Sequence, residues 1–375
     1  MYDDSTNLYK LDGKSVPLLN SLDDLLEQFG KLKKGLNFGY LYMMQNSRLF
    51  SLDFLKFVAA LMITNSHFQP LYEDVSPSLA TFGVHGNALF FFVSGFLLMK
   101  GFEKKKSPGF LNWYKGRMRR LWPAVFIWVV VSALVWKQTL TIGNLLLFDG
   151  YWFLQAIAVA YVIYYFLARP LKLIWGGKIR QMQYLFVLSL IVSIGYFFLM
   201  PIASGSPFHT SFHYVCHFSV MVMGGLCYLL KDKIKCTSIM RDMLWMLISF
   251  IAYFVILKIG KGAMGIRYDS QITALVPLHT FVYYLYKVAS YSWCEKAFHT
   301  KVLGKIMSWI AALTLEIYIV QFAFITNQFN FMFPLNVLLV LTIIVLAAYL
   351  LKVMTSLFLV VLSKENLVWK EMMRL

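Results

Sequence analysis

The chain has 375 residues, of which 59% are hydrophobic and only 14% are charged, and its formal net charge is +17. Soluble domains average about 25% charged residues, so this composition excludes a soluble enzyme and predicts an integral membrane protein. We assign the positive charge to cytoplasmic loops that follow the positive-inside rule, and not to nucleic acid binding. The four cysteines have no paired short spacing, which indicates neither a metal knuckle nor a disulfide framework.

Residues 1–47 are polar and mixed in character, so we expect a cytoplasmic segment without a cleavable signal peptide. Within it, residues 21–36 begin with a capping Ser21 and repeat apolar residues at helical spacing. This pattern predicts a short amphipathic helix on the inner membrane surface or against the helix bundle. A mobile tail with one soluble helix is the open alternative.

Ten apolar segments follow, each near the roughly 20 residues that cross a bilayer as a helix. They predict an all-α transmembrane domain over residues 48–362 with about ten transmembrane helices, followed by a cytoplasmic tail over 363–375. The expected spans are 50–69, 84–100, 120–137, 150–168, 183–201, 212–230, 243–259, 271–288, 304–326 and 334–362.

The distribution of basic residues among the loops orients these ten spans. With the N-terminus in the cytoplasm, the four inner loops carry twenty Lys and Arg residues, whereas the five outer loops carry four. Adding or removing one span would turn every later inner loop into an outer loop, and the reverse, and the excess of basic residues on one side would be lost. We therefore expect both termini in the cytoplasm and the protein in the cytoplasmic (inner) membrane.

The first expected span contains Asp53, Lys56 and His67, which are costly in hydrocarbon unless they are paired or line a polar cavity. Lys56 and His67 are eleven residues apart, so they share a helix face and lie about 16 Å apart along the axis. With Lys56 near the cytoplasmic end and His67 near the outer end, this polar stripe predicts the wall of an internal passage. Alternatively, Lys56 is a snorkelling end residue paired with Asp53, and His67 is an interfacial histidine bonded to a loop carbonyl.

The second span adds small and polar residues. Ser94 and Gly95 would let a ligand or another backbone approach closely in the membrane, although ordinary helix packing explains them equally well. His85 and Asn87 open this span on the outer side and are candidate acceptor contacts. Trp152, at the outer start of the fourth span, is a further candidate or, alternatively, part of an aromatic belt.

The inner loop that leads into the third span is strongly basic. Arg117 and Arg120 are three residues apart and share a helix face, and Arg119 lies between them in sequence. Guanidinium groups bind phosphates through bidentate hydrogen bonds, so these arginines predict a phosphate site at the inner membrane surface. Topogenic charge or contact with anionic lipids is the alternative.

Glu316 and Tyr318 lie within the ninth span, where an unpaired glutamate is costly. We expect Glu316 to pair with Lys56 or another residue of the bundle, and to support the site without reacting. Three histidines recur every four residues at the outer edge of the sixth span, a spacing that could align them for a metal. No carboxylate joins them, so we expect an acceptor-binding or interfacial role and no metal. These histidines are His209, His213 and His217.

Three of these features, in this order, are typical of the membrane acyltransferase-3 family, which the chain resembles over roughly residues 48–362. The first is a basic residue, ten further residues and a histidine, here Lys56 to His67. The second is a Phe-Phe-x-x-Ser-Gly run, here residues 90–95. The third is an Arg-x-x-Arg pair, here within residues 117–120.

Two later segments are also similar to the family. Residues 151–164 resemble its Trp-Tyr-Leu segment. Residues 313–321 resemble its late Ser-x-Glu-Ile-Tyr-x-x-His segment, with Gln321 in place of the histidine. The glutamate that one branch carries in the fourth span is not matched, since Ile157 and Ala158 stand in that neighbourhood.

The resemblance implies transfer of an acyl group, usually acetyl, from cytoplasmic acyl-CoA to a hydroxyl of a cell-surface polysaccharide or lipid-linked glycan. In this scheme Arg117, Arg119 and Arg120 hold the phosphates of the donor, acetyl-CoA. His67 then deprotonates the acceptor hydroxyl, or carries the acyl group as an acyl-imidazole. The implied partners are membrane lipids, acyl-CoA and the glycan acceptor.

Two functions of other classes compete with this enzyme. A transporter or flippase for a glycan or small solute would use the polar stripe to carry its substrate, but inverted repeats and broken helices, which are common in transporters, are not evident in the sequence. A non-catalytic membrane scaffold would leave Lys56, His67 and Glu316 unexplained.

Overall fold

The computed structural model describes residues 2–3, 8–11, 14–17, 49–103, 109–169, 177–200, 206–261 and 266–363. The chain divides into two compact units, Met1–Leu49 and Phe50–Leu375.

The first unit contains three short strands, β1 (Tyr2–Asp3), β2 (Leu8–Leu11) and β3 (Lys14–Pro17), which form an antiparallel sheet in the order β1-β2-β3. This sheet was not predicted from the sequence, so the all-α prediction applies to the second unit and not to the first. The amphipathic helix predicted over 21–36 lies outside the described residues.

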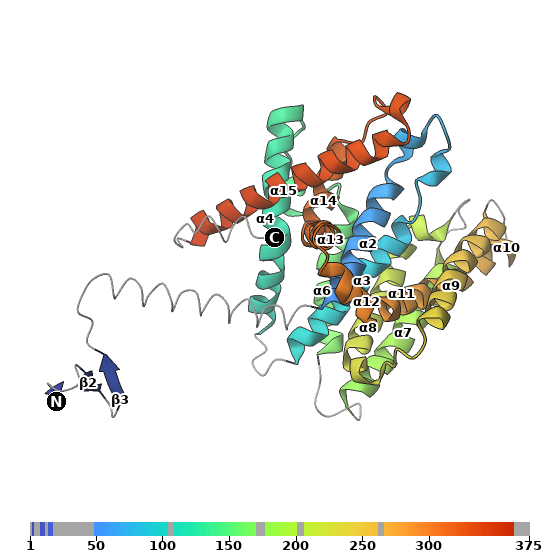
Figure 1. Cartoon of the computed structure of the whole chain (residues 1–375). Coiled ribbons are helices and arrows are strands. Elements are labelled where there is room, and N and C mark those ends of the chain that lie inside the picture. The colour runs from blue at the N-terminus through green and yellow to red at the C-terminus, as the bar shows by residue number, and fades with distance from the viewer. Residues whose placement is uncertain are drawn as a thin grey trace. The chain divides into compact units, whose positions relative to one another are not determined.

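All described elements of the second unit are helical (Figure 1). The α-helices are α2 (Phe50–Ser66), α3 (Gly83–Phe102), α4 (Phe110–Trp136), α5 (Ile142–Leu146), α6 (Trp152–Ala168), α7 (Lys178–Leu199), α8 (Phe212–Leu229), α9 (Ile239–Gly260), α10 (Ile266–Asp269), α11 (Leu275–Ala289), α12 (Ser292–Phe298), α13 (Leu303–Ala312), α14 (Thr314–Val320) and α15 (Leu335–Ser363). Short 3-10 turns connect them at Gln69–Tyr72, Pro77–Leu79, Pro207–His209, Lys231–Lys233, Ser270–Ala274, Gln321–Ala323 and Asn330–Met332.

Six of the described helices are long and apolar enough to cross a membrane, namely those containing α3, α4, α7, α8, α9 and α15. The pair α13 and α14 makes a seventh if the two are counted as one bent span, and α6 is a shorter apolar helix. The second unit is therefore a multi-pass, helical membrane domain. Each of the ten predicted spans coincides with a helix or a helix pair, although several of these helices are shorter than a complete span.

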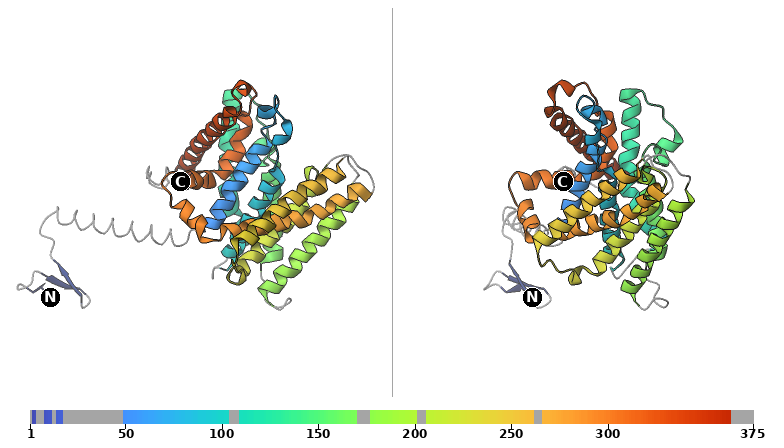
Figure 2. Two further views of the ribbon diagram at one scale, coloured as in Figure 1. Left: turned by 45° about the vertical axis from the view of Figure 1, so that its right-hand side comes forward. Right: turned by 90° about the vertical axis from the view of Figure 1, so that its right-hand side faces the viewer.

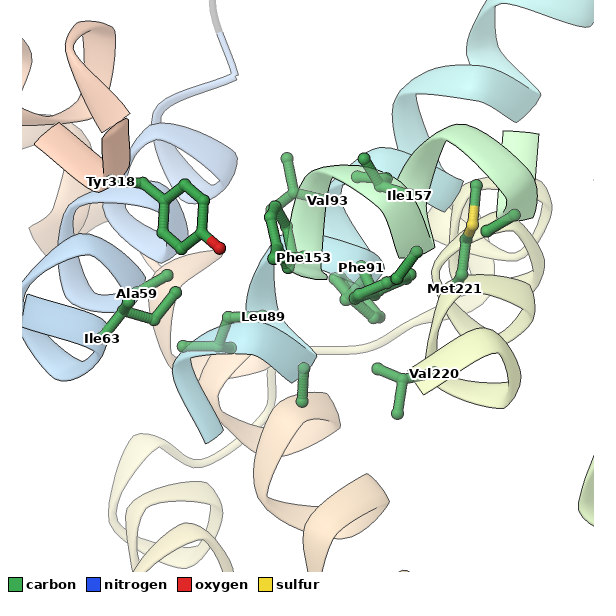
Figure 3. Close-up of a cluster of buried hydrophobic side chains, with 14 of the residues drawn as sticks. Ala59, Ile63, Leu89, Phe91, Val93, Phe153, Ile157, Val220, Met221 and Tyr318 are labelled. Carbon is green, nitrogen blue, oxygen red and sulfur yellow. The ribbon is translucent and has the colours of Figure 1, made fainter. Parts of the chain in front are cut away.

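Helices α3 and α8 form the centre of this domain. In each of them, 67% of the most apolar window is buried, against only 17% in α9, whose apolar side chains face outward. Figures 1 and 2 show α4 and α15 on one side of α2 and α3, and α7, α9 and α10 on the other. Figure 3 shows part of the packed core, where the ring of Phe91 on α3 lies beside that of Phe153 on α6, with the centroids 5.4 Å apart.

Two glycines allow α3 and α8 to cross closely. A Cβ atom on Gly95 would lie 1.8 Å from the carbonyl oxygen of Met221, and one on Gly224 would lie 2.0 Å from that of Phe92. Both distances are far below van der Waals contact, so no larger residue fits at either position without moving a helix. The hydroxyl of Tyr164 donates a hydrogen bond to the Gly95 carbonyl at 3.1 Å and fixes α6 against the crossing.

Two helices differ from the outline of the predicted spans. Helix α4 begins at Phe110, ten residues before the predicted third span, and its first turn is held by Trp113, which is buried against Phe102 and Tyr165. The ninth predicted span is not one straight helix, since α13 and α14 meet at 67° on either side of Leu313.

Candidate active site

A polar cavity of about 510 Å³ opens where α2, α3, α6, α8 and α9 end, and we call it the His67 cavity. Its lining combines imidazole, amide and hydroxyl groups with aromatic rings, a mixture typical of sites that orient a small polar substrate. The lining residues are Ser66, His67, Gln69, Ala80, Thr81, Phe82, Gly83, Val84, Asn87, Trp152, Phe208, His213, His217, Tyr253, Phe254 and Leu257.

His67 directly follows the last residue of α2 and is half-buried at the cavity wall. Its ring meets the edge of Phe322 with the ring centroids 4.7 Å apart. Asn65 braces the chain next to it, donating from Nδ2 to the Leu79 carbonyl at 2.8 Å while its Oδ1 accepts from the Tyr72 hydroxyl at 2.7 Å. Burial raises the pKa of the Tyr72 phenol, so the hydroxyl keeps the proton that this bond requires.

Trp152 and two histidines of α8 form the opposite wall. The rings of Trp152 and His213 have their centroids 4.0 Å apart. His217 lies 2.6 Å through Nδ1 from the His213 carbonyl oxygen and 3.2 Å through Nε2 from that of Val84. Because both nitrogens face carbonyl oxygens, this ring connects α8 to the start of α3 and fixes the wall.

The two predicted acceptor contacts on α3 have different surroundings. Asn87 lines the His67 cavity, whereas His85 is not among its lining residues. The His85 ring is fully buried among aromatic rings, with centroids 4.4 Å from Tyr253 and 4.9 Å from Phe281. Its two nitrogens have no hydrogen-bond partner among the described residues. The structure therefore brings Asn87 and Trp152 to His67, but not His85.

At the other end of α2, Lys56 forms an ion pair with Asp53 at 2.5 Å, and both side chains are partly exposed. This is the local pairing considered above as the alternative to a functional Lys56. Between Lys56 and His67, Ala60 and Thr64 are buried, so this face of α2 packs inside the bundle.

A second row of residues runs along α3 from the cavity to the basic segment. Asn87, Ser94 and Gly101 are spaced by seven residues, so they lie near one face of the helix over about 21 Å. Ser94 lies near the hydroxyl of Tyr161 of α6. The Arg117 Nη2 atom lies 3.6 Å from the position that a Cβ atom on Gly101 would occupy. Arg117 thus stands at the far end of the row that begins in the His67 cavity.

The three predicted phosphate-binding arginines all lie on α4. Arg117 is half-buried and lies over the ring of Trp113, 5.5 Å from its centroid. Arg119 and Arg120 are exposed, and Arg120 is near enough to Arg117 and Tyr161 to interact with both electrostatically. The Arg117 and Arg120 guanidinium groups therefore lie near each other in the first half of α4.

The remaining predicted site residues support the framework. Gly95 allows α3 and α8 to cross closely. Glu316 is 2% exposed and pairs at 3.0 Å with Lys352 of α15, so its partner is another residue of the bundle and not Lys56. Tyr318 is buried, with its ring centroid 5.5 Å from Phe153. Among the described residues, no group of three or more His, Cys, Asp or Glu side chains is placed to hold a metal ion.

The helical fold and the apolar helices define a multi-pass membrane protein. Its sequence is matched by a family model described as an acyltransferase domain over residues 49–357. The match covers most of the chain, so the protein belongs to the membrane acyltransferase-3 family and its reaction is an acyl transfer. Comparison with curated protein sequences gives no match. The resemblance found in the sequence motifs is thus confirmed at the level of the family.

Proposed function

We propose that this protein transfers an acyl group, usually acetyl, from cytoplasmic acyl-CoA to a hydroxyl of a glycan on the outer side of the cytoplasmic membrane. The acceptor is a cell-surface polysaccharide or a lipid-linked glycan. In this proposal all ten helical segments cross the membrane and both termini are cytoplasmic. The excess of Lys and Arg in the four inner loops supports this orientation.

The row on α3 is the observation that carries the proposal. It connects the arginines at the inner end with the His67 cavity at the outer end over about 21 Å, most of the roughly 30 Å hydrocarbon core. Arg117, Arg119 and Arg120 bind the phosphates of the coenzyme in the cytoplasm. Its narrow thiol-bearing arm follows Ser94 toward the cavity, where it presents the thioester.

In the cavity, His67 acts as the general base. Its unprotonated ring nitrogen accepts the proton of the acceptor hydroxyl, while the hydroxyl oxygen attacks the thioester carbonyl carbon. The carbon–sulfur bond then breaks, an ester forms, and coenzyme A leaves as a thiolate that takes up the proton. Asn87 and Trp152 hold the acceptor against the opposite wall. A two-step route through an acyl-imidazole on His67 gives the same products.

Label transfer tests this proposal directly. Purified protein is incubated with radiolabelled acetyl-CoA and a membrane glycan extract, and we expect His67→Ala to lower transfer by about 10²–10⁴-fold, the range for loss of a general base. His299→Ala is the matched control, because His299 is exposed outside the cavity. Thermal unfolding of both variants verifies folding. Undiminished transfer by folded His67→Ala protein would contradict the role of this residue.

The proposed phosphate-binding role of the arginines is tested separately, by coenzyme binding. We expect the double variant Arg117→Ala with Arg120→Ala to bind coenzyme A more weakly in calorimetry, because two charge-assisted phosphate contacts are lost. The control replaces Lys301 and Lys305 with Ala, which removes the same charge from exposed inner positions. Equal affinities in both double variants would mean that the arginines serve topology alone.

A further inference from the structure

A second polar cavity, of about 430 Å³, lies at the outer ends of α4 and α6 and the chain between them. We call it the Asp149 cavity. Its lining includes Ser132, Gln138, Asn144, Asp149, Tyr151 and Phe322. None of these residues has a role in the reaction described above.

Aromatic residues connect the lining of the Asp149 cavity with that of the His67 cavity. Phe322 lines the Asp149 cavity and meets the ring of His67 at 4.7 Å. Tyr151 lines the Asp149 cavity, while the next residue, Trp152, lines the His67 cavity. Tyr318, labelled in Figure 3, packs against these residues, with ring centroids 6.1 Å from Tyr151 and 6.4 Å from Phe322. His67 therefore stands at the boundary between the two spaces.

The lining of the Asp149 cavity indicates the chemistry of its ligand. The described residues that line it include no lysine or arginine, so the cavity does not suit a phosphate or another anion. Amide, hydroxyl and carboxylate groups stand beside aromatic rings, and together they donate and accept many hydrogen bonds next to an apolar surface. A sugar ring presents the complementary groups, hydroxyls around its edge and C–H bonds on its faces.

Two of the polar side chains are held in place by the loop itself. Asp149 accepts from the Gly150 backbone N–H through Oδ1 at 3.1 Å, and Asn144 donates through Nδ2 to the Thr139 carbonyl at 3.3 Å. The Tyr151 hydroxyl donates to the Ile319 carbonyl at 3.4 Å, which connects the loop to the segment carrying Phe322. The cavity is thus a preformed part of the fold, of a size within the usual range for ligand sites.

We propose that the Asp149 cavity binds a neighbouring sugar unit of the acceptor, so that the enzyme holds an oligosaccharide on both sides of His67 and acylates the unit in the His67 cavity. This inference rests on the proposed function, because it deepens the identity of the acceptor. It makes the substrate an oligosaccharide or longer glycan and not a monosaccharide.

The test uses saccharides of defined length. Envelope glycan is treated with alkali to remove existing O-acyl esters, partially hydrolysed, and fractionated by size. Initial rates with labelled acetyl-CoA then give KM for each fraction. We expect KM of the wild type to fall by about tenfold between one sugar unit and two or more, as one to two further hydrogen bonds predict.

The decisive variant is Gln138→Ala with Asp149→Asn. It should raise KM for the longer acceptors by about tenfold, leave KM for single units unchanged, and leave kcat unchanged. The matched control, Gln328→Ala with Asp74→Asn, makes the same changes at exposed positions that line neither cavity. A test variant that keeps the wild-type dependence of KM on length would overturn the proposal.

A binding measurement separates this inference from the proposed function. If the wild type transfers no label to any fraction, the proposed reaction is wrong, and the cavity is tested by binding of the same unlabelled oligosaccharides to immobilised protein. Weaker binding to the test variant than to the control variant supports the sugar site. Equal binding to both overturns it.

Discussion

The ion pair between Glu316 and Lys352 connects α14 with α15, and its contribution to stability can be measured. The Glu316 side chain is 2% exposed and its Oε1 atom lies 3.0 Å from Lys352 Nζ. Its second oxygen has no hydrogen-bond partner among the described residues. The Lys352 side chain, by contrast, is 38% exposed. Loss of the lysine should therefore cost more unfolding free energy than loss of the glutamate.

This difference predicts an order of stabilities. Lys352→Met leaves a buried carboxylate without its cation, which costs about 3–5 kcal/mol of unfolding free energy. Glu316→Gln removes the charge but keeps an amide oxygen that can accept from Lys352, so the loss is nearer about 2 kcal/mol, the value for one hydrogen bond to a charged group. The double variant Glu316→Leu with Lys352→Met replaces the pair by apolar groups and should lie within about 1 kcal/mol of the wild type.

The assay is denaturant-driven unfolding of the purified protein in detergent micelles, with the four proteins measured under one condition. The expected order is wild type close to the double variant, then Glu316→Gln, then Lys352→Met. The reasoning fails if the double variant is as unstable as Lys352→Met, because removal of the second charge would then recover nothing.

Two further predictions concern packing and a second buried ion pair. Gly95→Ala should destabilise the protein strongly, because the new methyl group meets a backbone carbonyl on α8, whereas Gly116→Ala, with nothing within 4 Å, should be neutral in thermal unfolding. Lys287→Met should lower the unfolding free energy by about 3 kcal/mol, since it removes the nearer cation, 2.9 Å from fully buried Asp242, and leaves Arg241 at 3.7 Å. Adding Asp242→Asn to that variant should recover part of the loss, and no recovery would count against the pairing.

The positions of the helices followed from the sequence because an apolar run of about twenty residues has few alternatives in a membrane. The bend at Leu313 did not, since neither proline nor glycine marks it and the hydropathy continues through it. The strands within residues 2–17 were also missed. They are too short for an alternating pattern to stand out.

The candidate site could be predicted in part. His67, Asn87 and Trp152 were selected from sequence, and the structure brings them to one cavity. Helix geometry alone predicts that His85 and Asn87 point to nearly opposite faces, because an advance of two residues rotates the helix by about 200°. Only one of them could therefore line the cavity. Lys352 was not predictable as the partner of Glu316, since the pairing depends on how distant helices pack.

The crossing of α3 and α8 has a consequence for the size of the His67 cavity. Gly95 and Gly224 mark the crossing point, and the ends of the two helices that line the His67 cavity carry Asn87 and His217 about 10–12 Å from it. A small change in the crossing angle therefore moves Asn87 and His217 by a larger distance. The width of the His67 cavity thus depends on two glycines that do not line it.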